Sequence, residues 1–307
     1  MDTIKTINLR HIGSDSEIHL INAAKNALET TGFFLLSNHG ISEKLLREVE
    51  SLYSIFFQEL TLNERMKYSF PKLFYQKGYT PVDTEKGEFA SVADRKHFFQ
   101  FGDQYGMIFV EEVPELKEKS EELYQQFNNL YQSLMQVVAV TLGLDKNHFD
   151  EELGNSMVRR IHYPAHPNPT VEDKDVSKAV QGGNALGMCA SMHTDINDLT
   201  LLHATEPGLQ LWHNNKWLPI TCEFETIIIN AGDMLWHLTG GRYKSGLHRV
   251  VCQPNVDRTA SPFFGHRKDE CSVVPLSHLG YSDLTTFRFQ TEGEFLQHRL
   301  EQIFAKK

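Results

Sequence analysis

The second half of the chain is divided into short apolar segments by Gly, Pro and Asn, and this spacing restricts the fold more than any other feature. From about residue 156 the segments read MVRRIHYP, LTLLHA, LQLW, WLPI, TIIINAGDML, GLHRVVC and TASPFF. Segments that alternate or run apolar over such lengths indicate strands. Several strands at this close spacing predict two sheets packed face to face, as in a β-sandwich or jelly roll.

The first half and the carboxyl end have a different pattern, because their apolar residues recur at helical spacing. We predict helices over residues 16–32, 42–60 and 116–144, and another in the carboxyl-terminal segment TEGEFLQHRLEQIFAKK. Residues 33–40, FFLLSNHG, predict a short strand and a turn, and residues 61–115 read as loops with short elements. The chain is therefore expected to be mainly β with flanking helices.

Helices that pack on a jelly roll can share its core, so the chain is divided into regions rather than independent domains. The α-helical N-terminal region packed on the core is expected to span residues 1–115, followed by a long support helix over 116–150. The jelly-roll core is expected over 151–270, and a C-terminal helical segment over 271–307.

Composition excludes some classes of partner. The chain has 307 residues, is 40% hydrophobic and carries a formal net charge of −10, which argues against a nucleic-acid or anionic-membrane binder. Its amino terminus lacks the apolar core of a signal peptide, and its apolar runs are too short to cross a bilayer. The four cysteines show no CxxC spacing, so we expect reduced thiols and a cytoplasmic location. Oligomeric state is left open.

The segment SMHTDINDLTLL contains a candidate pair of metal ligands, His193 and Asp195. Residues two apart in a strand face the same side, so one imidazole and one carboxylate can point into a barrel. Together they form two thirds of the 2-His-1-carboxylate triad that binds Fe(II) and leaves positions open. The pair alone is weak, because His-x-acid matches arise by chance in a His-rich chain. A second match, His148 and Asp150, lies in a polar segment and predicts a solvated turn.

A third ligand has to come from another strand, and the segment GDMLWHLTGGRYKSGLHRVV offers His237 and His248. His248 follows a Gly-rich turn at the start of a strand, where its side chain can face the interior. His237 is better explained as a structural histidine. Arg258, one strand further on, can make a fork-shaped contact with a carboxylate, although a surface arginine remains the alternative.

In this order, the motifs resemble the Fe(II)/2-oxoglutarate-dependent oxygenases of the isopenicillin N synthase-like family. The resemblance covers nearly the whole chain and rests on GFFLLSNHGI, HTDINDLTLL, GLQL…KWLPI, NAGDML…GRYKSGLHRVV and DRTASPFF. It implies a distorted double-stranded β-helix, the jelly-roll core of this family, with helices packed outside.

The resemblance also implies a set of roles. His193, Asp195 and His248 would hold Fe(II), Arg258 would bind the C5 carboxylate of 2-oxoglutarate, and Tyr163 would either contact this co-substrate or belong to the core. With O2, such an enzyme oxidises a C–H bond of a small metabolite by hydroxylation, desaturation or cyclisation, and releases succinate and CO2. No catalytic residue beyond the metal ligands is expected.

One position departs from the family pattern. Relatives usually carry Arg-x-Ser on the co-substrate strand, and the Ser position here is Ala260. The neighbouring Ser261 should face the other side of the sheet unless a β-bulge intervenes. A lost hydrogen bond to a carboxylate is worth about 1.5–3 kcal/mol. Two alternatives therefore stay open: an Fe(II) oxidase of the same fold that does not consume 2-oxoglutarate, and a non-catalytic metal- or ligand-binding module.

The substrate pocket is the least constrained part of the sequence. Phe264, Trp236 and Arg160 are expected to line it, together with the loops at 73–83 and 94–102. A cationic lining predicts a small-molecule substrate that carries a carboxylate, such as an amino acid or small peptide. The alternative is that the arginines form surface ion pairs.

Overall fold

The computed structural model describes residues 4–11, 17–85, 93–165, 188–204, 206–221, 223–251, 255–279 and 288–304. The first part of the chain contains β1 (Thr6–Asn8), α1 (Glu17–Thr30), β2 (Phe33–Ser37), α2 (Glu43–Ser54), a π-helical turn (Ile55–Glu59), α3 (Leu62–Met66), β3 (Gly78–Thr80), β4 (His97–Gly102) and α4 (Leu116–Thr141). The second part contains β5 (Met157–Tyr163), β6 (Met188–His193), β7 (Leu199–Ala204), β8 (Leu209–His213), β9 (Lys216–Pro219), β10 (Thr226–Ala231), α6 (Asp233–Leu238), β11 (His248–Val251), β12 (Arg258–Gly265) and α7 (Glu292–Phe304). Short 3-10 turns cover Leu9–His11, Pro71–Leu73 and Ser277–Leu279.

The predicted helices of the first half form where the apolar spacing placed them. Helix α2 begins after Ser42, whose side chain accepts a hydrogen bond from the Leu45 N–H and so caps the helix. Helix α1 ends before Gly32, which has a φ of +74°. A Cβ at Gly32 would lie 1.9 Å from the Lys244 carbonyl oxygen, so the close approach of these segments requires glycine.

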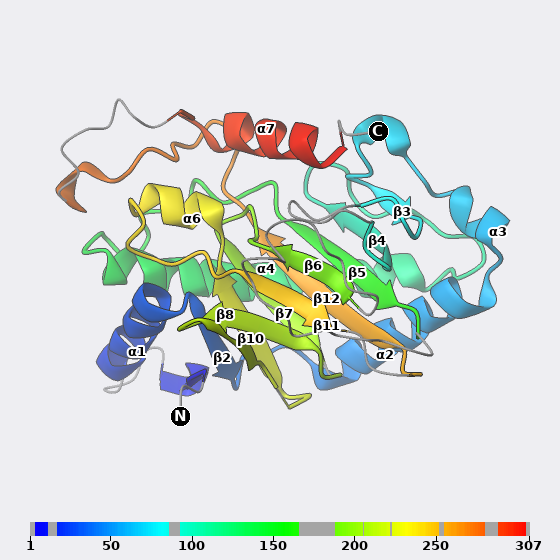
Figure 1. Ribbon diagram of the computed structural model, residues 1–307, viewed down its shortest axis with the longest axis horizontal. Coiled ribbons are helices and arrows are strands. Elements are labelled where there is room, and N and C mark those ends of the chain that lie inside the picture. The colour runs from blue at the N-terminus through cyan, green and yellow to red at the C-terminus, as the bar shows by residue number, and fades with distance from the viewer. Residues whose placement is uncertain are drawn as a thin grey trace.

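The strands form two sheets, as the segment spacing predicted. The larger sheet has eight strands in the order β1-β2-β10-β7-β12-β5-β4-β3, and the smaller has four in the order β6-β11-β8-β9. Apolar side chains from both sheets, including Ile161, Leu209 and Val250, pack in one inner cluster. The two sheets therefore face each other, as in the jelly-roll fold (Figure 1).

The N-terminal region is less helical than the sequence indicated. Strands β1, β2, β3 and β4 all come from it, and they extend both edges of the larger sheet. β3 and β4 lie within residues 61–115, which the sequence predicted as loops with short elements. Their pairing depends on distant partners, such as Phe98 opposite Ile161, that local periodicity does not reveal.

Helices cover the outer face of the larger sheet. α1 and α2 each pack against α4, and α4 contacts β7 and β12. The aromatic rings of Tyr124, Phe127 and Tyr131 on α4 pack around Phe263 of β12. Helix α7 lies apart from this layer, along the top of Figure 1, above the ends of the strands. This arrangement leaves the inner face of the sheet free for a site.

Two local predictions were wrong. The segment following β10 was predicted to continue as a strand, but it turns at Gly232 into helix α6. Cys189 is disulfide-bonded, although we expected reduced thiols, because spacing along the sequence does not report distance in the fold; Cys271 is free. No helix among the described ranges is long and apolar enough to cross a membrane.

Candidate metal and co-substrate site

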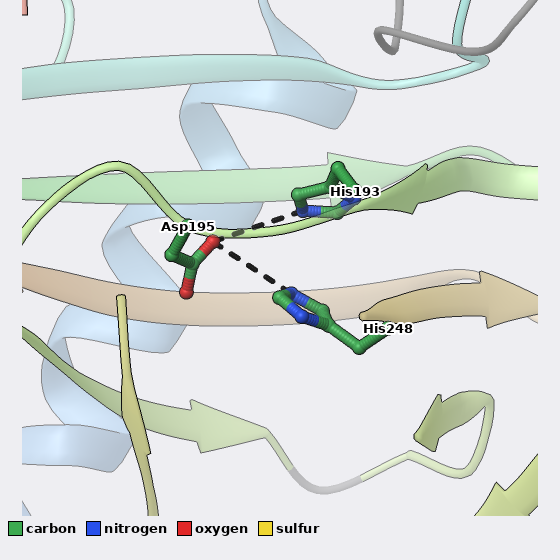
Figure 2. Close-up of side chains that lie close together, drawn as sticks. All are labelled: His193, Asp195 and His248. Carbon is green, nitrogen blue, oxygen red and sulfur yellow. Dashed lines mark ion pairs between the residues drawn. The ribbon is translucent and has the colours of Figure 1, made fainter. Parts of the chain in front are cut away.

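Three predicted ligands meet between the two sheets. His193 is the last residue of β6, His248 is the first residue of β11, and the two are register partners. The sequence predicted His193 and Asp195 in one strand, but Asp195 lies two residues beyond the end of β6, so only His193 is in a strand. Figure 2 shows the two imidazoles and the carboxylate pointing toward one another.

The distances suit a single metal ion. His193 Nε2 and His248 Nε2 lie 3.8 Å and 3.7 Å from Asp195 Oδ1, and one donor atom from each residue lies within 4.8 Å of the others. Two metal–ligand bonds of about 2 Å can span each of these two His–Asp separations. The donor set, two imidazoles and one carboxylate, is the set that holds Fe(II) on one face and leaves other positions open.

Backbone carbonyls fix both imidazoles in the tautomer that a metal requires. The Nδ1–H of His193 donates to the Ser191 carbonyl at 2.7 Å, and the Nδ1–H of His248 donates to the Gly246 carbonyl at 2.9 Å. Each Nε2 therefore keeps its lone pair for a metal. Burial and the adjacent His248 lower the pKa of His193 to about 4, so this imidazole is neutral near pH 7.

The carboxylate is held from behind by two buried side chains. Thr200 donates its hydroxyl proton to Asp195 Oδ2 at 2.6 Å, and Asn230 Nδ2 donates to the same oxygen at 2.8 Å. Oδ1 is thereby left facing the histidines. Burial would raise the pKa of Asp195, but the two imidazoles and these hydrogen bonds hold it below its usual value.

Arg258 and Tyr163 lie deeper in the same cavity. They are register partners on β12 and β5, and the Arg258 guanidinium lies 5.0 Å from the centre of the Tyr163 ring. Arg258 is 3% exposed, and its Nε donates to the Glu206 carbonyl at 3.3 Å. Neither Nη1 nor Nη2 has a hydrogen-bond partner in the part of the chain that the structure describes. A buried guanidinium with its fork open into a cavity fits the carboxylate of a bound dicarboxylic acid.

The strand register settles the orientation of Ala260 and Ser261. Ala260 pairs with Ile161 and lines the cavity with Arg258, whereas Ser261 pairs with His203 on the outer face. The pairing of β12 with β7 runs without a bulge, and the Ser261 hydroxyl accepts a hydrogen bond from Arg160 Nη1. The cavity therefore lacks the hydroxyl that Arg-x-Ser would supply, as the sequence predicted.

Models of two protein families match the chain. The model of the 2OG-Fe(II) oxygenase superfamily matches residues 154–267, and the N-terminal model of non-haem dioxygenases in morphine synthesis matches residues 4–128. The chain belongs to the Fe(II)/2-oxoglutarate oxygenases of the isopenicillin N synthase-like group. It is a non-haem Fe(II)/2-oxoglutarate-dependent dioxygenase.

Individual oxygenases share most of its length. The chain is 29% identical to the 2-oxoglutarate-dependent dioxygenase citB of Monascus ruber, over 89% of this chain and 86% of that protein. It is 28% identical to leucoanthocyanidin dioxygenase of Malus domestica, over 97% and 83% of the two chains. A full-length Neurospora crassa protein, solved in complex with alpha-KG, superposes with a TM-score of 0.82 at 22% identity, over 97% of this chain and 95% of that chain. This last likeness shows a shared fold.

The oxygenase has a second cavity at the mouth of the first. The mouth leads to the His-Asp-His cluster, because both cavities are lined by His193, Asp195, Lys96, Arg159 and Phe264. Phe264 lies where the sequence predicted a pocket residue. The mouth is also lined by α7, through Leu296, Arg299, Leu300 and Ile303.

Two residues predicted to line the oxygenase pocket lie elsewhere. Arg160 is on the outer face of β5, where its guanidinium contacts Ser261 and lies 3.4 Å from Glu50. Its neighbour Arg159 faces the cavities, because adjacent strand residues point to opposite sides. Trp236 is on α6, is 39% exposed and packs against His237, outside both cavities. The unpredicted start of α6 accounts for this difference.

Other residues of the site escaped the sequence reasoning. Asn230 had a visible signal, since it is a lone polar residue in the apolar run TIIINA. Thr200 had none, because Thr is common in strands. Lys96 and Asp94 belong to the segment 94–102, which the sequence predicted to line the pocket, but the contact of Asp94 with Ser191 depends on parts of the chain that are far apart in sequence.

Proposed function

We propose that His193, Asp195 and His248 hold the Fe(II) of this dioxygenase, and that Arg258 and Tyr163 bind 2-oxoglutarate beside it. The observation that carries the proposal is the open Arg258 guanidinium, which is buried in the cavity that the three ligands share. When bound, iron and 2-oxoglutarate supply the oxidant that attacks a C–H bond of the substrate. The protein's own residues orient the reactants and exclude water.

Each protein group has a distinct part in this arrangement. Thr200 and Asn230 keep one oxygen of Asp195 turned toward the metal position. Arg258 neutralises the distal carboxylate of the co-substrate, and the Tyr163 ring packs along the guanidinium. Phe264 stands where the two cavities join, and it is proposed to orient the substrate over the iron.

The substrate is a small molecule, and we propose that it carries a carboxylate. Arg159 supports this proposal in place of Arg160, because it is the arginine of β5 that lines both cavities. Phe264 stays in the proposed substrate site, whereas the exposed position of Trp236 gives it no part there. A cytoplasmic location and the division into regions at residues 115, 150 and 270 remain proposals drawn from the sequence.

A second candidate keeps the same iron site but does not consume 2-oxoglutarate. Ala260 favours it, because the cavity lacks one expected hydroxyl. The open Arg258 fork opposes it, because a buried cation without an anionic ligand is costly. The non-catalytic alternative has no support from the site, since the triad and the co-substrate cavity are both present.

Anaerobic titration of the Fe(II)-loaded protein with 2-oxoglutarate tests the proposal. The chelate has a weak visible charge-transfer band, which should appear and saturate in the wild-type protein. Arg258→Ala should require at least about tenfold more 2-oxoglutarate, since a hydrogen bond to a charged group is worth about 1.5–3 kcal/mol. Arg242→Ala is the matched control, because Arg242 pairs with Glu29 away from both cavities. Absence of the band at millimolar 2-oxoglutarate would favour the second candidate.

A further inference from the structure

The mouth cavity has two walls of opposite character. Leu296, Leu300 and Ile303 of α7 form an apolar wall, with Met157 and Phe264 nearby. Helix α7 lies above the strand ends in Figure 1. A second, charged wall carries Glu85, Asp94, Lys96 and Arg159, and α7 also contributes Arg299 to the lining. The space between the walls is open to solvent and connects with the cavity that holds Arg258 through the residues the two share.

Three hydrogen bonds hold the Arg159 side chain in place, but they do not engage all of its N–H donors. Its Nε donates to Gln100 Oε1 at 2.8 Å, and its Nη1 donates to the two Glu85 oxygens at 3.0 and 3.1 Å. The guanidinium lies 4.0 Å from the centre of the Phe98 ring and 5.5 Å from that of Phe264. Nη2 makes no hydrogen bond to the described residues, so two N–H donors remain for a ligand.

Lys96 adds a further donor to the same wall. Its buried ammonium group lies 2.9 Å from Glu85 and 3.0 Å from Asp94, which accounts for two of its three protons. Although burial would raise the pKa of Glu85, Arg159 and Lys96 together lower it to about 2. Glu85 and Asp94 balance the charges of Arg159 and Lys96, so what the wall offers a ligand is their unused N–H donors.

We infer that the mouth selects an amphipathic substrate whose carboxylate binds Arg159 and Lys96 and whose apolar body lies against α7. The inference rests on the proposed function and specifies its substrate class. The unused N–H donors of Arg159 and Lys96 require an acceptor group, and hydrogen bonds from guanidinium and ammonium donors are stronger to a carboxylate than to a neutral amide. Three aliphatic side chains on α7 require an apolar partner, because a polar one would lose its water without compensation.

The test uses octanoate, octanamide, octylamine and butanoate as probes, with binding measured by calorimetry. The protein is loaded anaerobically with Fe(II) and saturated with 2-oxoglutarate, so that the co-substrate site is filled. Octanoate should bind at least about tenfold more tightly than octanamide, and octylamine should not bind. Butanoate should bind more weakly than octanoate, because it buries less apolar surface against α7.

Two variants then test which residue produces the preference for octanoate over octanamide. Arg159→Gln should remove most of the preference for octanoate over octanamide and leave octanamide binding unchanged. Arg242→Gln, at the surface, should keep the preference. Equal binding of octanoate and octanamide to the wild type, a preference that survives Arg159→Gln, or no octanoate binding at all would overturn the inference. The 2-oxoglutarate band in the same sample reports separately on the proposed function, and its persistence in Arg159→Gln shows that the variant is folded.

Discussion

Asp94 accepts two hydrogen bonds from Ser191, and the Ser191 carbonyl in turn accepts one from His193, a proposed metal ligand. Asp94 Oδ1 accepts hydrogen bonds from the Ser191 backbone N–H at 3.0 Å and from its hydroxyl at 2.6 Å. The Ser191 carbonyl accepts the Nδ1–H of His193. The segment before β4, in the larger sheet, therefore holds strand β6 of the smaller sheet, which carries His193.

We predict that Asp94→Ala lowers metal affinity by about 10- to 100-fold, the usual effect of removing a group that supports a ligand. Competition between the protein and a chelator for Co(II) measures the affinity, and the Co(II) visible spectrum reports the ligand geometry. Asp94→Asn keeps an acceptor for Ser191 and should retain more of the affinity. Exposed Asp145→Ala is the control. Unchanged Co(II) affinity and spectrum in Asp94→Ala would show that Ser191 is positioned without it.

Thr200→Val is predicted to weaken metal binding by a similar factor, because it removes the hydroxyl that holds Asp195 Oδ2. The substitution conserves shape, so the strand should remain intact. Thr259→Val is a matched control, since that hydroxyl bonds to Glu50 on the outer face of the sheet. The affinities of the two variants can be compared by titration with Mn(II), because the electron paramagnetic resonance signal of the free ion decreases as the ion binds. Equal affinities would mean that Asn230 alone orients the carboxylate.

Ala260→Ser is predicted to strengthen 2-oxoglutarate binding about tenfold, because it restores a hydroxyl on the cavity face next to Arg258. Ser261→Ala should leave the affinity unchanged, because that hydroxyl contacts Arg160 outside the cavity. Both affinities can be read from the anaerobic charge-transfer titration. A larger effect of Ser261→Ala than of Ala260→Ser would contradict the strand register described above.

The stability of the metal-free protein should fall as the pH is lowered below about 6.5, in part through His97. This side chain lies between the Tyr79 hydroxyl, 3.0 Å from Nδ1, and His162 Nδ1, 2.6 Å from Nε2. Burial, and then the adjacent His162, lower the pKa of His97 to about 3. The unfolded chain, with a pKa of about 6.5, therefore binds more protons between these values, and protonation favours unfolding.

His97→Gln tests this dependence by urea unfolding at pH 7.5, 6 and 5. Wild-type stability should decrease more steeply than that of the variant, by up to about 1.4 kcal/mol per pH unit. Buried histidines that do not contact His97 titrate in both proteins and cancel in the comparison, and His162→Gln is the second variant because His162 is hydrogen-bonded to His97. Parallel pH profiles would exclude a contribution of His97.

The sequence predicted what depends on local pattern and on well-separated motifs. Strand and helix periodicity gave the two-sheet architecture, and the motif order gave His193, Asp195, His248 and Arg258, which the fold brings to one cavity. The sequence-based prediction failed where the strand register determines which face of the sheet a side chain occupies. Arg159 and Arg160 differ only in which face they occupy, and MVRRIHYP does not reveal that face until its neighbours are known. Helix α7 was predicted as a helix, but not as a wall of the mouth.

The residues proposed to hold the iron and the co-substrate belong to different sheets. His193 and His248 belong to the smaller sheet, and Arg258 and Tyr163 to the larger one. A co-substrate that bound both the iron and Arg258 would connect the two sheets, which share no strand pairing among the described residues. Iron and 2-oxoglutarate should therefore protect the protein against heat more when added together than the sum of their separate effects. The same pair of ligands would then both stabilise the packing of the two sheets and form the reactive site, and neither ligand alone would do so.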